Sequence, residues 1–159
     1  MVLGNQVEWA IHCCSVLSGL GVGERVSTKT LAEFHGVPKE YLSKALQQLA
    51  QAEIIDGTLG PKGGYRLNKP ADQISFLDIV EAIEGRKTTF QCTEIRANNP
   101  CIKGEKMKGI CGVAQVMYRA DEAWRDELRR VTLVDLQKTL KKNVSADLLQ
   151  RSGEWLSRD

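Results

Sequence analysis

Residues 31–55, LAEFHGVPKEYLSKALQQLAQAEII, contain two helical segments separated by a tight turn. Ser27 is a good cap for the first segment, and Gly36 is expected to end it, because glycine adopts the left-handed conformation that closes many helices. Pro38 suits the first turn of the second segment. Apolar residues then recur at helical spacing, namely Tyr41, Leu42, Ala45, Leu46 and Leu49. A short helix that meets a longer one in this way is typical of a helix-turn-helix.

The flanking segments extend this pattern to a winged helix-turn-helix domain. Short strands are predicted at 54–55 and 65–67, with a Gly-rich turn between them, and a hairpin placed directly after the second helix is a wing. Helical spacing also predicts a helix over 5–20 and another that Ser75 caps and Gly85 ends. Cys14 falls on the apolar stripe of the first of these and is expected in the core, whereas Cys13 lies off the stripe and is expected to be an extra thiol or a surface residue. The predicted fold is therefore mainly α with a small β-wing, and the DNA-binding domain spans residues 1–85.

The remainder of the chain divides into three further parts. Residues 86–111 form a long loop that contains three of the five cysteines, and residues 112–142 form two helices, the second capped by Thr132. Residues 143–159 are a C-terminal tail, expected to be weakly structured or docked on a neighbour. The first helix of 112–142 is too long to bury its apolar stripe on a domain that already closes on itself, which favours a homodimer with this helix as the dimerisation helix. Packing of the stripe against the first helix of the same chain is the alternative.

Composition limits the environment and the partners. The chain has 159 residues and 42% hydrophobic residues, with no apolar run long enough to cross a membrane and no secretion signal. We therefore expect a cytoplasmic protein without a membrane partner, in which cysteines stay reduced and serve as ligands or reactive groups. The formal net charge is only +2, so DNA would have to be bound through a local basic patch.

The helix-turn-helix reading identifies candidate contacts to a double-stranded DNA operator. The N-terminal part of the helix after Pro38 would enter the major groove, the start of the preceding helix would touch phosphate, and the wing would reach the adjacent minor groove or backbone. The candidate residues are Thr28, Lys29, Lys39, Glu40, Tyr41, Ser43, Lys44, Lys62 and Arg66.

Two groups of residues suggest metal chemistry. Cys92, Cys101 and Cys111 lack the C-x-x-C spacing of a zinc ribbon, but three loop thiols in a reducing compartment indicate a soft metal or an iron–sulfur cluster. Glu8 and His12 lie four residues apart, so a helix presents their carboxylate and imidazole on one side. The alternatives are unrelated loop cysteines and, for Glu8 with His12, a surface ion pair or a core histidine.

The chain resembles the IscR/NsrR/RsrR (Rrf-two) family of winged-helix regulators in its helix-turn-helix, its GPKGGYRLNKP wing (60–70), ISFLDIVEAIEG (74–85) and the cysteine loop that follows. The stretches VEWAIHCC (7–14) and CTEIR (92–96) are most similar to the RsrR branch. The resemblance implies a dimer with a 2Fe-2S cluster, held by Glu8 and His12 of one chain and by two loop cysteines of the other. Cys101 and Cys111 are the favoured pair, with Cys92 as the spare.

Two other classes of function are possible for such a sequence. A cluster-free winged-helix regulator would sense oxidation through its cysteine thiols or bind a small effector. An enzyme is not expected, because the sequence presents no nucleophile–base pair, phosphate loop or paired catalytic carboxylates.

Overall fold

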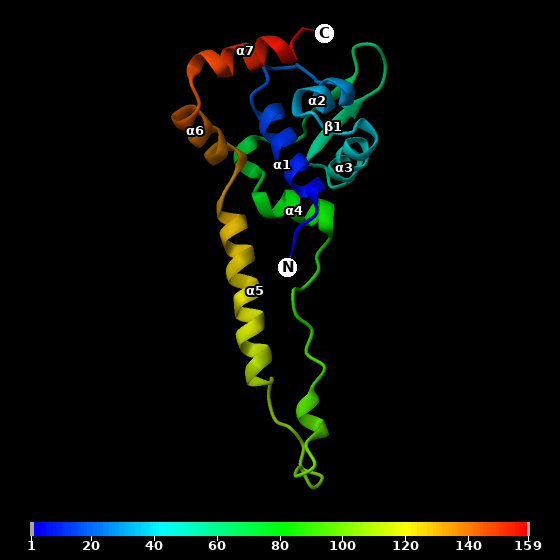
Figure 1. Ribbon diagram of the computed structural model, residues 1–159, viewed down its shortest axis with the longest axis vertical. Helices are drawn as coiled ribbons and strands as arrows, with labels where there is room; N and C mark the ends of the chain where they lie inside the picture. The colour runs from blue at the N-terminus through cyan, green and yellow to red at the C-terminus, as the bar shows by residue number, and fades with distance from the viewer. Residues whose placement is uncertain (1, 159) are drawn as a thin grey trace.

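The computed structural model describes residues 2–158 and is mainly helical with one small antiparallel sheet (Figure 1). The prediction of a mainly α fold with a β-wing is confirmed. The elements are α1 (Asn5–Ser18), α2 (Thr28–His35), α3 (Lys39–Gln51), β1 (Ile55–Thr58), β2 (Gly64–Leu67), η1 (Ala71–Gln73), α4 (Phe76–Glu84), η2 (Ile95–Asn98), α5 (Gly112–Arg130), α6 (Leu133–Asn143) and α7 (Ala146–Leu156).

Local sequence signals set the ends of several helices. The Ser27 hydroxyl accepts a hydrogen bond from the Thr30 N–H at 3.0 Å, and Gly36 ends α2 with φ of 64°. Ser75 begins α4 with a capping box, in which its hydroxyl accepts from the Asp78 N–H and the Asp78 carboxylate accepts from the Ser75 N–H. These predicted helix starts and ends are confirmed. They could be predicted because each depends on residues within one turn of the helix terminus.

The core is built around α1, which packs against α3, α4, α6 and β2. The helix is surrounded on several sides, so its burial extends beyond the predicted apolar stripe. Cys14 is fully buried, as expected, and Cys13 is fully buried as well. The prediction that Cys13 is an extra thiol or a surface residue is therefore wrong.

The wing is the β1–β2 hairpin, with Ile55 opposite Leu67 and Thr58 opposite Gly64. A short bridge between Val26 and Tyr65 attaches it to the segment before α2. Gly64 has φ of 147°, and a Cβ there would lie 2.6 Å from the Val26 carbonyl oxygen. Glycine at position 64 is therefore required for this close approach.

The C-terminal part of the chain returns to the core. Leu133 of α6 is fully buried, and its N–H donates to the Ile74 carbonyl at 3.0 Å, so the packed core extends beyond the predicted boundary at residue 85. The tail was expected to be either weakly structured or docked on a neighbour, and the first alternative is wrong for residues 146–156, which form α7. This helix lies against α2, with the Trp155 and Phe34 ring centroids 5.5 Å apart.

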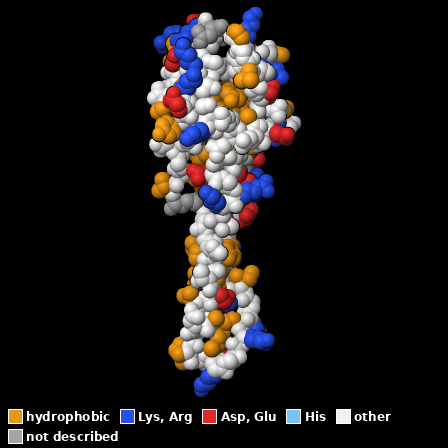
Figure 2. Space-filling model, turned by 90° about the vertical axis from the view of Figure 1, so that its right-hand side faces the viewer, with side chains coloured by type: hydrophobic (Ala, Val, Ile, Leu, Met, Phe, Trp, Pro, Cys, Tyr) orange, Lys and Arg blue, Asp and Glu red, His pale blue; other side chains and the backbone are white. Residues whose placement is uncertain are grey.

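One part of the molecule projects away from this body (Figure 1). It consists of the loop 86–111 and the first half of α5, residues 112–120, and is called the cysteine arm below. The C-terminal half of α5 packs near α4, whereas most apolar side chains of its N-terminal half face solvent, Ala114 being buried. Hydrophobic side chains accordingly gather on the narrow part of the surface (Figure 2). The exposed ones are Ile95, Met107, Ile110, Val113, Val116, Met117 and Tyr118.

Candidate nucleic-acid interface and cysteine arm

The N-terminal half of α3 offers an open polar face to a ligand. Its predicted contact residues Lys39, Glu40, Tyr41 and Lys44 are exposed, and Ser43 is half-buried. The Lys44 ammonium lies 5.7 Å from the centre of the Tyr41 ring. Leu42, Leu46 and Leu49 are fully buried on the opposite side, as predicted. The core therefore fixes which face of α3 is free to enter a groove.

The other predicted contact residues flank this helix. Lys29 is exposed and Thr28 half-buried at the start of α2, and Lys62 is exposed in the turn of the wing. Arg66 is exposed on β2, but its Nε also lies 3.3 Å from the Asp56 carboxylate. Lys29, Lys62 and the helix α3 thus supply local positive charge, as the low net charge requires.

The base of the wing is held by Arg25, which sequence reasoning missed. Its guanidinium donates to the carbonyl oxygens of Asp56 and Gly64 at 3.1 and 3.2 Å, and to the Asp56 carboxylate at 2.8 Å. The hydrogen bond from Arg25 is the main reason why the pKa of the Asp56 carboxyl is lowered. One side chain therefore joins both strands, and a lone arginine before the first helix of the motif gave no signal of this role.

We expect Arg25→Met to destabilise the protein by about 1–3 kcal/mol, because charged donors to two backbone carbonyls are lost. Amide hydrogen exchange in 55–58 and 64–67 should increase at the same time. The control is Arg86→Met, since Arg86 is 87% exposed in its pair with Glu81 and such pairs contribute about 0–1 kcal/mol. Equal effects of the two substitutions on unfolding would contradict this role for Arg25.

Glu8 and His12 lie on the solvent-facing side of α1. Both are exposed, which rules out a core histidine, and together with Ile11 and the chain before α1 they line a hollow of about 310 Å³. The His12 ring lies 5.8 Å from the His35 ring of α2. The pKa of His35 is lowered, first by burial and second by His12. The carboxylate and imidazole of α1 are thus accessible from outside the chain.

The three loop cysteines lie in the cysteine arm, in different surroundings. Cys111 is half-buried at the N-cap of α5, whereas Cys101 is exposed. Cys92 is half-buried, and its sulfur accepts a hydrogen bond from the Glu94 N–H at 3.4 Å. Because the N–H groups of Ala114 and Val113 point at its sulfur, the pKa of Cys111 is lowered.

Arg96 organises this part of the arm and was also missed from sequence. Its guanidinium pairs with the Glu94 carboxylate, at 2.7 Å for one of the two contacts, and donates to the Gly109 carbonyl at 3.0 Å. The pKa of Arg96 is raised mainly by Glu94, with smaller contributions from Cys111 and Cys92. Arg96 therefore places positive charge beside the Cys111 and Cys92 thiols. Its only signal was its position four residues after Cys92.

The two groups of predicted ligands do not meet within one chain. Glu8 and His12 belong to α1 in the helical body, whereas the loop 86–111 that contains the three cysteines projects away from it (Figure 1). Among residues 2–158, no three His, Cys, Asp or Glu side chains come close enough to hold a metal ion. Any site that combines the two groups therefore needs a second copy of the chain.

The five thiols should differ strongly in reactivity. Burial raises the pKa of Cys13 to about 12, and burial with a contribution from Cys13 raises that of Cys14 as well. The thiolate is the reactive form, so the lowered pKa of Cys111 lets its alkylation reach full rate at a lower pH than that of free cysteine. Iodoacetamide at neutral pH, followed by peptide mass spectrometry, should modify Cys111 and leave Cys13 and Cys14 intact.

The same reaction in guanidinium chloride is the control, in which all five cysteines should react. Modification of Cys13 or Cys14 in the native protein as fast as Cys111 would contradict the assignment.

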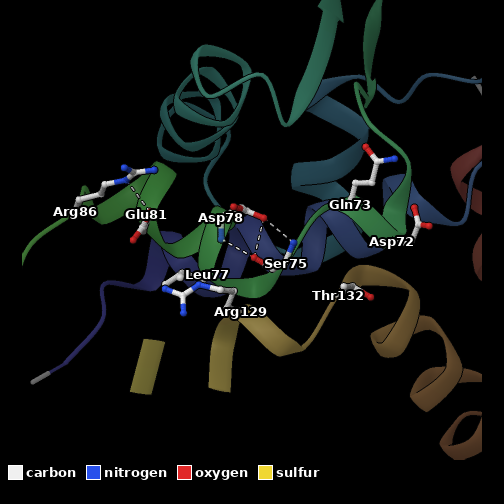
Figure 3. A pocket seen from close by; sticks show the side chains of 9 residues that line it. All are labelled: Asp72, Gln73, Ser75, Leu77, Asp78, Glu81, Arg86, Arg129 and Thr132. Carbon is white, nitrogen blue, oxygen red and sulfur yellow. Dashed lines mark hydrogen bonds and ion pairs between the residues drawn. The ribbon is translucent and has the colours of Figure 1, made fainter. Parts of the chain in front are cut away.

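A hollow of about 500 Å³ lies where α4 meets the α5–α6 junction (Figure 3). Four of its polar side chains are paired with one another. Asp78 binds the Ser75 hydroxyl at 2.7 Å, and Arg86 donates to Glu81 at 2.9 Å. Both contacts contribute to the local structure, one as a helix cap and the other as an ion pair across the end of α4.

Comparison with known proteins adds independent information. The model of the Rrf2 family, described as an iron-dependent transcriptional regulator, matches residues 3–139. The protein rrf2 of Nitratidesulfovibrio vulgaris is 32% identical over 118 residues, which cover 74% of this chain and 75% of that protein.

Solved structures agree with this match. The IscR structure from T. potens has a TM-score of 0.70 at 19% identity and covers 92% of this chain and 93% of its own. The oxidized form of Staphylococcus aureus CymR has a TM-score of 0.62 at 27% identity and covers 86% and 95%. Within residues 2–158, no helix has the length and apolar character needed to span a bilayer. The relatives are regulators of transcription and not enzymes, and the chain belongs to the Rrf2 family of DNA-binding transcriptional regulators.

Proposed function

We propose that this regulator is a homodimer whose affinity for operator DNA depends on a 2Fe-2S cluster, as in the RsrR branch of the family. Glu8 and His12 of one chain and Cys101 and Cys111 of the other would hold the cluster. The observation that carries the proposal is the separation of these ligands: an exposed carboxylate and imidazole on α1, and exposed or half-buried thiols on a projecting arm. Each chain thus offers one half of a ligand set.

The donor atoms fit such a cluster. Thiolate sulfur is the usual ligand of iron in these clusters, and imidazole nitrogen replaces it in some of them. Cys111 favours the thiolate form because its pKa is lowered, and the Arg96 guanidinium beside it offsets negative charge. The bound cluster would supply a one-electron redox change. The chain's own residues would hold it at the junction of two protomers.

The exposed apolar face of α5 supports the dimer. Val113, Val116 and Met117 are 65%, 54% and 37% exposed, and they recur at helical spacing on one side of the arm. An apolar stripe on a projecting helix is stabilised when a second copy covers it. A two-fold arrangement would also place two α3 helices on paired half-sites of the operator. We assign residues 112–142 to dimerisation and 86–111 to the cluster loop on these grounds.

The DNA contacts are proposed from exposure and position. Lys39, Glu40, Tyr41, Ser43 and Lys44 lie on the free face of α3 and would reach base edges or phosphates. Thr28 and Lys29 at the start of α2, with Lys62 and Arg66 of the wing, would contact the backbone or minor groove. Arg66 would have to share its guanidinium with Asp56.

A cluster-free thiol sensor is the second candidate. The lowered pKa of Cys111 favours oxidation, and the relative that is 27% identical was solved in an oxidized form. In that case Glu8 would have no part in regulation, whereas Cys111 would remain essential. The two candidates therefore differ in what they require of α1.

The test is to purify the protein without oxygen, record its absorption spectrum, and measure its iron and sulfide content. DNA affinity is then compared for the cluster-loaded, reduced and cluster-free forms, using a duplex that the wild-type chain selects from a random pool. A change of about tenfold corresponds to about 1.4 kcal/mol, within the usual range of coupling between sites. Equal affinity of all cluster forms would refute the cluster as a switch. Regulation by diamide oxidation alone would favour the thiol sensor.

A further inference from the structure

The cysteine arm is attached to the winged-helix domain through the side chain of Arg125. Its Nη1 lies 2.7 Å from Glu81 of α4, its Nε 3.1 Å from Asp121 of α5, and its Nη2 donates to the Lys87 carbonyl at 2.5 Å. The Arg125, Asp121 and Glu81 side chains are only 12%, 10% and 20% exposed. A single guanidinium thus joins α4, α5 and the start of the cysteine loop.

On the arm side, further contacts make the loop and α5 one unit. The Thr89 N–H donates to Asp121 at 3.3 Å, and the Phe90 and Tyr118 rings lie 5.9 Å apart. The start of the cysteine loop is therefore tied to α5 next to the contacts that Arg125 makes.

On the domain side, α4 connects the contacts of Arg125 to α3, the helix proposed to enter the major groove. It packs against both α1 and α3, and the Gln48 side-chain amide of α3 donates to the Ile83 carbonyl of α4 at 3.3 Å. The contacts from loop to Arg125, α4 and α3 are continuous. Packed side chains, hydrogen bonds and rigid helices of this kind can carry coupling between distant sites.

The chemistry of arginine suits a rigid joint. A guanidinium is planar and presents its donors in a fixed fork, so two carboxylates and a carbonyl bound to it are held at set angles. A residue without charge would leave the poorly exposed Asp121 carboxylate without a cationic partner and Glu81 with Arg86 alone, whose side chain is 87% exposed. The interface between α4 and α5 would then loosen or shift.

We propose that Arg125 is the positioning residue through which the state of the cysteine arm reaches α3. The proposal rests on regulated DNA binding, but it holds for a cluster and for a thiol sensor alike. Without Arg125, the arm and the winged-helix domain reorient independently. Both states of the loop then bind DNA with nearly the same affinity.

The experiment compares the full-length wild type with Arg125→Met in the cluster-loaded and cluster-free forms, and in the diamide-oxidised and reduced forms. Absorption spectrum and native mass establish loading and assembly. For a pair of loop states between which the DNA affinity of the wild type changes by tenfold or more, the DNA affinity of Arg125→Met is expected to change by less than about twofold. Arg125→Lys, which keeps the charge without the fork, should lie between them.

Arg129→Met is the matched control, because Arg129 lies one turn further along α5 and pairs with Asp126 and Glu122 of the same helix. It should keep the wild-type ratio. Amide hydrogen exchange of the cluster-free proteins gives a readout that needs no regulation: exchange should rise across 86–90 and 39–51 in Arg125→Met but not in Arg129→Met. The proposal would be overturned if folded Arg125→Met kept the wild-type ratio of DNA affinities between loop states, or if amide exchange in both segments were unchanged. Equal affinities of the wild type in all states would instead refute the proposed function.

Discussion

Replacing Cys111 with alanine is expected to abolish binding of the cluster, and Glu8→Ala is expected to do the same from the opposite side of the site. Each substitution removes one residue that would bind iron directly. Loss even of a residue that only hydrogen-bonds to such a ligand commonly lowers metal affinity by about 10–100-fold. Iron and sulfide per chain should therefore fall at least about tenfold in anaerobically purified protein. The visible absorption should be lost in parallel.

Cys92→Ala is the matched control for Cys111→Ala. Both residues are half-buried thiols beside Arg96, but only Cys111 is assigned as a ligand. Cys92→Ala should keep the absorption and the iron content of the wild type. Loss of the cluster in Cys92→Ala with retention in Cys101→Ala would show that the wrong pair of thiols was assigned. Full iron content in Glu8→Ala would exclude the shared ligand set.

Val116→Glu should dissociate the dimer. Val116 is 54% exposed on a projecting helix, so the folded monomer tolerates the carboxylate, whereas a two-fold interface would bury two like charges. Burial of an unpaired ion costs several kcal/mol, and each 1.4 kcal/mol changes a dissociation constant tenfold. The dimer dissociation constant should therefore rise by about 10³-fold or more. Sedimentation equilibrium over a range of concentrations measures it, and cluster content and DNA affinity should fall with the loss of dimer.

Glu122→Lys provides the comparison on the same helix. Glu122 is exposed and lies roughly on the opposite face of α5 from the apolar stripe, so the change of charge there should leave the dimer intact. If Val116→Glu remains dimeric at low micromolar concentration, α5 is not the dimer interface. The exposed stripe would then need another occupant.

The helix-turn-helix was predictable because its signals are local. Ser27, Gly36 and Ser75 act on backbone groups within a turn of themselves, and Leu42, Leu46 and Leu49 share one side of a helix whatever they pack against. The wing followed from its glycines, although β1 begins at Ile55 and continues to Thr58, beyond the predicted strand. Strand pairing depends on the partner strand, so its ends are less visible in sequence.

Other features depended on contacts between distant residues. Residues 146–156 have only scattered apolar side chains, and Trp155 finds its partner Phe34 more than a hundred positions earlier in the chain. Cys13 lies off the apolar stripe of α1 but is covered because that helix is surrounded by several elements. Arg25, Arg96 and Arg125 are three more such cases, since the groups that each one holds come from separate segments.

Sequence alone was enough to predict the order of the helices, the caps that bound them, the buried face of α3 and the residues proposed to bind DNA and iron. These properties follow from interactions over a few residues. Only the tertiary structure decided that Glu8 and His12 lie apart from Cys101 and Cys111 within one chain, and that Arg125 joins the arm to the domain. Distances between side chains from different elements are set by the packing of the whole core, which no local pattern specifies.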